Sequence, residues 1–279
     1  MNRVAVVTDS TAYLPAAQAS AAQVVVVPVQ VIVGGQTMDE TSVSPDDIAD
    51  ALREWRPIST SRPSPSAFVE AYQQLALDGA NEIVSIHLSG AMSATVESAE
   101  LAAKEVSIPV HVVDSRTVGM GLGFPVLAAA QAAADGADAA RVEEIARRRV
   151  AMSSVLFYVD TLEYLRRGGR IGKAAALVGS ALSVKPLLHL VDGRVTPLEK
   201  VRTTSKALVR LEELALERVG EGAADIAVQH LANAERAYAL AARIQEAAGG
   251  AVAVTVGEVG AVVGAHVGPG MIAVAVCPR

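Results

Sequence analysis

The stretch Glu82–Ser98, with the sequence EIVSIHLSGAMSATVES, shows the pattern from which the fold follows. Its first half is short, rich in β-branched residues and bounded by polar residues, which predicts a buried strand. An Ala-rich helical pattern then runs to about Glu105. Because the first N–H groups of a helix have no partners and lie at the positive end of its dipole, this position can accept an anion. Ser93 is predicted either to cap its own helix, the common role of Ser there, or to contact a ligand.

The alternation of strand and helix recurs through the first half of the chain. Val4–Thr8 and Pro109–Val113 are predicted strands, and Ser44 and Ser64, each followed by Pro, predict helix starts. Such repeats indicate a parallel sheet with helices on both faces, in which ligands bind at the carboxyl ends of the strands. The loops expected at that edge are Asp9–Thr11, Ser89–Ser93 and Asp114–Ser115.

Two further segments of the first half connect these units. Val24–Val33 is predicted as one apolar strand, interrupted by Pro28 and closed by two glycines. Ser59–Pro65, with the sequence STSRPSP, is predicted as a hydroxyl-rich loop.

The pattern changes near residue 151. Lys185–Val191 and Arg194–Glu199 flank Asp192–Gly193, a strong signal for a two-residue hairpin. Amphipathic helices and further short strands follow, which indicates a mixed sheet. We therefore expect an α/β protein of two domains: a three-layer α/β/α parallel-sheet domain over residues 1–152 and a mixed-sheet α/β domain over 153–279. With no long Pro, Ser or Gly linker between them, the domains are expected to pack closely and leave a crevice.

Composition narrows the classes of function. Hydrophobic residues make up 51% of the 279 residues, and the net charge is −6, so nothing favours nucleic acid as a partner. The one cysteine, Cys277, makes no intrachain disulfide and is expected to be a buried thiol. The N-terminus turns polar too soon for a signal peptide, and no apolar run is long enough to span a bilayer. We expect a cytoplasmic protein with no metal site, because the five histidines are scattered.

Several glycine-rich segments could carry chemistry. Gly119–Gly123 lacks the spacing of a dinucleotide site, so close helix packing explains it better. Gly168–Lys173 is one residue short of a phosphate-binding loop. The basic residues around it suit a solvated helix end, or else Arg170 holds an anion in the crevice. His266 lies between small residues, as a core histidine or a site histidine.

In their order and spacing, these segments resemble the DegV family, and the resemblance runs nearly end to end. The family resembles the fatty-acid-binding (FakB) subunits of bacterial fatty acid kinases. Those subunits hold an acyl chain in a tunnel and present its carboxyl group to a separate ATP-using kinase subunit (FakA). The kinase subunit makes an acyl phosphate that feeds phospholipid synthesis. The matching segments are Thr8–Pro15, Thr60–Pro65, Ile86–Ser93, Val113–Ser115, Gly168–Ile171, Lys185–Pro186, Asp192–Gly193, Lys200–Thr203 and Ala265–Gly268.

The resemblance implies roles for individual residues. Thr60 and Ser93 would bind the fatty acid carboxylate, and His266 and Arg170 would support it from the second domain. Arg202 would face the kinase subunit. Three positions depart from the family pattern near the carboxylate: Arg62, Gly90 and Ala94. The acyl tunnel is expected in the core of the N-terminal domain, lined by residues such as Leu88, Met92, Val118, Leu122, Phe124 and Leu127.

The chemistry of a lipid carrier agrees with this reading. Burial of each CH₂ group contributes about 0.8 kcal/mol, so a long chain contributes on the order of 10 kcal/mol before costs. A carrier needs no cofactor or catalytic residue of its own, and its membrane contact would be transient. Two alternatives stay open: a small-molecule kinase or hydrolase using Asp9 or Asp114 at the crevice, and a regulatory protein whose lipid only fills space.

Overall fold

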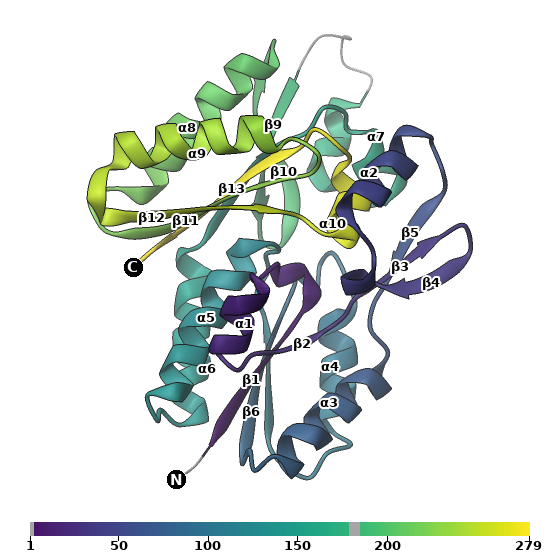
Figure 1. Cartoon of the computed structure of the whole chain (residues 1–279), viewed down its shortest axis with the longest axis vertical. Helices are drawn as coiled ribbons and strands as arrows, with labels where there is room; N and C mark the ends of the chain where they lie inside the picture. Colours follow the sequence, from purple (N-terminus) through teal and green to yellow (C-terminus); the bar gives the residue numbers. More distant parts are fainter. Residues whose placement is uncertain (1–2, 179–184) are drawn as a thin grey trace. The chain divides into compact units, whose positions relative to one another are not determined.

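The computed structural model describes residues 3–178 and 185–279, and the chain divides into two compact units (Figure 1). The first unit combines the chain up to Gln30 with Ser61–Ala151. The second combines Val31–Thr60 with Met152–Arg279. The prediction of a two-part α/β protein is confirmed.

The first unit is a parallel sheet covered by helices on both faces (Figure 1). The strand order is β2-β1-β6-β7, and all neighbours pair in parallel. One core cluster joins the sheet to α5 and α6, and a second joins its other face to α3 and α4. The elements of this unit are β1 Val4–Asp9, α1 Ala16–Ala21, β2 Val25–Val27, α3 Pro65–Leu77, β6 Glu82–His87, α4 Thr95–Ala103, β7 Val110–Asp114, α5 Met120–Ala134 and α6 Ala139–Met152, with a 3₁₀ turn over Ser10–Ala12.

The large sheet of the second unit is mixed. Its strand order is β10-β9-β8-β13-β11-β12; only β11 and β12 pair in parallel. Helices α8 and α9 pack on one face of it (Figure 1). Its elements are β8 Ser154–Tyr158, α7 Glu163–Arg167, β9 Lys185–Val191, β10 Arg194–Val201, α8 Thr204–Val219, β11 Ala224–His230, α9 Ala234–Ala248, β12 Val252–Glu258, α10 Ala261–Val267 and β13 Ile272–Pro278, with 3₁₀ turns over Gly172–Leu177 and Gly249–Ala251.

The hairpin prediction is confirmed. Strands β9 and β10 pair antiparallel, and Arg194 lies opposite Val191. The two turn residues have positive φ, 49° at Asp192 and 74° at Gly193. Two positive φ angles are the mark of a type I′ turn, which is why Asp-Gly is favoured there.

Residues 31–60 differ from the sequence-based domain assignment, which placed them in the first domain. They form β3 Gln30–Val33, β4 Gln36–Asp39, a 3₁₀ turn over Glu40–Ser42, α2 Pro45–Arg53 and β5 Ile58–Ser61. The three strands make a small sheet of order β4-β3-β5, and α2 packs against α10. The segment joins the second unit because α2 buries Ile48 and Leu52, and because the Glu40 carboxylate accepts a hydrogen bond from the Val262 N–H at 2.8 Å.

Two local predictions are also corrected. Val24–Val33 is two strands in different sheets, because Pro28 lacks an N–H and cannot continue a ladder. The predicted loop Ser59–Pro65 begins as the end of β5. The close packing expected at Gly119–Gly123 is present: a Cβ on Gly123 would lie 2.9 Å from the Ala12 carbonyl oxygen.

A chain of buried hydrogen bonds crosses the first unit. The Tyr72 hydroxyl lies 2.7 Å from Ser85 Oγ, which lies 2.7 Å from His87 Nε2. His87 Nδ1 lies 3.1 Å from Asp9 Oδ2, which also accepts the Leu88 N–H at 2.9 Å. All four side chains are fully buried. This hydrogen-bond network anchors the loop that follows β6.

Candidate functional site

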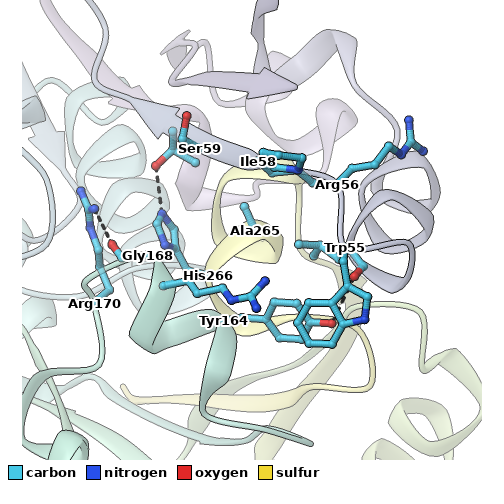
Figure 2. A pocket seen from close by; sticks show the side chains of 13 residues that line it. Trp55, Arg56, Ile58, Ser59, Tyr164, Gly168, Arg170, Ala265 and His266 are labelled. Atoms are coloured by element: carbon cyan, nitrogen blue, oxygen red, sulfur yellow. Dashed lines mark hydrogen bonds between the residues drawn. The ribbon is translucent and has the colours of Figure 1, made fainter. Parts of the chain in front are cut away.

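A pocket of about 490 Å³ lies within the second unit (Figure 2). Its walls come from α2 and the connection to β5, from β5 itself, and from α7 and α10. This volume lies in the range of small-molecule sites. The lining residues are Leu52, Trp55, Arg56, Pro57, Ile58, Ser59, Thr60, Tyr164, Arg167, Gly168, Arg170, Ala265 and His266.

The polar end of the pocket is built on a contact between Thr60 and His266. Thr60 lies on β5 and His266 in the last turn of α10, 206 positions later, and Thr60 Oγ1 lies 2.9 Å from His266 Nε2. Gly168 lets the imidazole lie against the backbone: a Cβ there would be 2.0 Å from His266 Nδ1. The structure thus brings together two of the residues that sequence reasoning singled out.

The protonation state of His266 decides which residue donates the hydrogen bond between His266 and Thr60. Burial first, and the Arg170 charge second, lower the pKa of His266 to about 4, so the imidazole is neutral at pH 7. Its Nδ1 is buried, and the described residues offer it no hydrogen-bond partner. A buried orphan N–H is rarer than an orphan acceptor, so we infer that Nε2 carries the proton and donates to Thr60 Oγ1. The Thr60 O–H can then donate to an anion in the pocket.

Arg170 brings a positive charge to the same pocket. It follows the glycine turn after α7, and its Nη1 donates to the Gly168 carbonyl at 2.7 Å. Its backbone N–H donates to the Leu165 carbonyl at 3.0 Å, which holds the turn closed. Thr60, His266 and Arg170 therefore place hydroxyl, imidazole and guanidinium groups around one cavity, a set that suits a carboxylate.

The other two predicted site residues, Ser93 and Arg202, are not among the residues that line this pocket. Ser93 belongs to the first unit and does not cap α4, which begins at Thr95 after Ala94. Its hydroxyl instead lies 2.9 Å from Thr95 Oγ1. Arg202 is exposed in the connection between β10 and α8.

Asp9 and Asp114, the carboxylates of the enzyme alternative, accept hydrogen bonds from backbone N–H groups. Asp9 is fully buried: its Oδ1 accepts from Thr11 N and Oγ1, and its Oδ2 from Leu88 N and His87. Asp114 Oδ1 accepts from the N–H groups of Gly90 and Arg116, at 3.1 and 2.8 Å. Both carboxylates therefore hold loops in place through these hydrogen bonds.

The departures from the family pattern also have structural partners. A Cβ on Gly90 would lie 3.0 Å from Asp114 Oδ2, so Gly fits tightly there. Arg62 forms an ion pair with Glu97 at 2.8 Å.

Sequence reasoning missed one side of the pocket. The Trp55 and Tyr164 rings stack with centroids 6.0 Å apart and an interplanar angle of 20°. The Arg167 guanidinium carbon lies 4.5 Å from the Trp55 ring centroid. The one available signal was that Trp55 is the only tryptophan of the chain.

Two features are absent from residues 3–178 and 185–279. In these ranges, no three His, Cys, Asp or Glu side chains gather so as to hold a metal ion. No helix in these ranges has both the length and the apolarity to cross a membrane.

Comparison with known proteins identifies the family. The family model described as "Uncharacterised protein, DegV family" matches residues 3–279. The chain belongs to the DegV family. A DegV domain-containing protein of Streptomyces coelicolor is 51% identical over 277 residues, 99% of each chain. One from Mycobacterium tuberculosis is 36% identical, covering 98% of this chain and 96% of that one.

Solved structures of DegV proteins share the fold. A DegV protein from Thermus thermophilus, described by its fatty acid binding, has a TM-score of 0.93 at 33% identity, covering 99% of this chain and 100% of the other. DegV from Bacillus subtilis, described as a fatty acid binding protein, has a TM-score of 0.92 at 31% identity over 100% of both chains.

Proposed function

We propose that this DegV protein binds a long-chain fatty acid and acts as a non-catalytic carrier. It presents the carboxylate to a separate ATP-dependent kinase subunit, which forms the acyl phosphate for phospholipid synthesis. The observation that carries the proposal is the neutral His266 bonded to Thr60 beside a pocket that also holds Arg170. DegV relatives of known structure that are described as fatty acid binding support it.

The geometry matches the needs of a carboxylate. A buried carboxylate is costly unless hydrogen bonds or an ion pair compensate it. The Thr60 O–H can donate to it, and the Arg170 guanidinium supplies the opposite charge. Because His266 is neutral, it orients Thr60 without adding a second charge that the empty pocket would have to bury. The acyl chain of the ligand needs an apolar tunnel as well.

Native mass spectrometry of the purified protein, followed by organic extraction, tests the binding step. We expect one fatty acid per chain. Thr60→Val keeps the shape of the side chain but removes its donor, so affinity should fall roughly 10- to 100-fold, the value of about 1.5–3 kcal/mol for a hydrogen bond to a charged group. The matched control is Thr196→Val on β10, outside the pocket. A ligand-free mass that stays unchanged when fatty acids are added would refute the proposal.

Ser93 and Arg202 test the finer parts of the proposal. Ser93→Ala should weaken fatty acid binding if its hydroxyl also binds the carboxylate. Arg202→Ala should leave fatty acid binding unchanged but reduce acyl-phosphate formation when the kinase subunit and ATP are added, because Arg202 is exposed and outside the pocket. Equal acyl-phosphate yields from wild type and Arg202→Ala would remove Arg202 from the partner surface.

A further inference from the structure

The pocket of the second unit has an outer and an inner end. Trp55 lines it yet is 56% exposed, and the side chains of Arg56 and Arg167 are 52% and 53% exposed. At the other end, Ala265 is buried and so is His266 Nδ1. Residues that both line a cavity and meet solvent lie at its mouth. Figure 2 shows Trp55 and Tyr164 together on one side of the pocket and His266 on the other.

The backbone of Trp55 is held in an unusual conformation. Its φ is +58°, in the left-handed region, one residue beyond the Glu54 C-cap of α2. The Trp55 N–H donates to the Leu52 carbonyl and the Arg56 N–H to the Ala51 carbonyl, at 3.1 and 2.9 Å, which is the hydrogen-bond pattern of a helix C-terminus that normally uses Gly. A bulky residue there is an outlier that persists only where its surroundings hold it, and such outliers cluster at functional sites.

The contacts that hold Trp55 join α2 to α7 at the mouth. Its indole stacks on Tyr164, and the Arg167 guanidinium lies 4.5 Å from the ring centroid. Arg167 Nε in turn donates to Glu163 Oε1 at 2.7 Å. The cation–π contact and the ion pair of Arg167 are both exposed, and each contributes little free energy in water. Trp55 and Arg167 can therefore separate at a small cost in free energy.

We propose that Trp55 and Arg167 form a gate at the mouth of this pocket that controls access to Thr60 and His266. With the pair in contact, the indole narrows the mouth; when the pair separates, the polar end becomes accessible from solvent. If the proposed function holds, on which this step rests, the molecule admitted or retained is one that carries a carboxylate, and the gate sets its dissociation rate.

A ligand-independent experiment tests the gate. Diethyl pyrocarbonate acylates neutral imidazole, and its reaction at each histidine can be followed by peptide mass spectrometry. We expect the reaction of His266 to speed up several-fold in Trp55→Gly and in Arg167→Gln. His189 on β9 serves as the internal reference. Arg166→Gln is the matched control, because Arg166 also pairs with Glu163 but does not line the pocket. Equal His266 rates in all four proteins would overturn the gate.

The variants separate gating from stability. Glycine is the natural residue for the backbone of Trp55, so Trp55→Gly should not lower Tm even as it exposes His266. When wild type and the three variants are each loaded with fatty acid, both gate variants should release it faster than Arg166→Gln does. If the gate variants bind fatty acid but release it at the wild-type rate, the gate does not control retention of the ligand. If wild type binds no fatty acid but His266 reactivity changes as expected, the gate stands and the proposed function fails.

Discussion

Two histidines of this chain each contact a hydroxyl side chain, but they differ in the pairing of the second ring nitrogen. His87 lies fully buried on β6 with both ring nitrogens engaged, one by Ser85 and the other by Asp9. His266 lies at the end of α10 with one nitrogen on Thr60 and the other buried without a partner among the described residues. His87 belongs to a closed network, whereas His266 lines a cavity.

The difference shows how to tell a structural polar group from a site. A network in which every donor and acceptor is paired stabilises the strands it joins and leaves nothing for a ligand. An incompletely paired group beside a cavity raises the free energy of the empty protein, and a ligand can recover part of that. The predictions below test this contrast through free energies of unfolding.

Asp9→Ala should have the largest effect. It removes the acceptor for His87 and for the N–H groups of Thr11 and Leu88, all in a buried environment. Loss of such a partner costs about 3–5 kcal/mol. Urea denaturation, followed by circular dichroism, measures the change. A loss under about 1 kcal/mol would show that the network is not the anchor described above.

The stability due to neutral His266 should depend on pH. Its folded pKa of about 4 lies below the ordinary histidine value of 6.5, so between these pH values the unfolded state binds more protons. The contribution is therefore fully present above pH 6.5 and is lost as the pH falls toward 4, by about 3 kcal/mol in total. Denaturation of wild type and His266→Gln across this window should show the slope reduced in the variant. Parallel curves would contradict the burial of a neutral imidazole.

Gly168→Ala should have an intermediate effect. The new Cβ would lie 2.0 Å from His266 Nδ1, so the imidazole must shift, and its contact with Thr60 is disturbed. Overpacking of this kind costs about 1–3 kcal/mol, and fatty acid affinity should fall with it. Gly222→Ala is the control, because nothing lies within 4 Å of its Cβ position. Equal Tm values for the two variants would show that the pocket yields without strain.

Tyr72→Phe should have the smallest effect. It removes the outermost member of the His87 network, the hydroxyl 2.7 Å from Ser85 Oγ, and keeps the ring packed on Phe68. One neutral hydrogen bond contributes about 1 kcal/mol. Thermal denaturation should show a small decrease in Tm with fatty acid binding unchanged. A loss as large as that of Asp9→Ala would mean that the network acts as one unit.

The sequence by itself determined the elements whose causes are local. The parallel unit, the Asp192–Gly193 hairpin and the helix starts at Ser44 and Ser64 follow from strand patterning, turn residues and caps, all of which act over a few residues. Resemblance to the DegV family also pointed to Thr60, Arg170 and His266, which the structure places around one pocket.

Tertiary structure alone decided what depends on distant partners. Residues 31–60 join the second unit because α2 finds its apolar partner in α10, more than 200 positions away, and no local pattern records that choice. The contact between Thr60 and His266 depends on the same pairing. Trp55 follows a helix in sequence, but only the packing of α7 beside it makes it a wall of the pocket, since burial and stacking are properties of the folded chain.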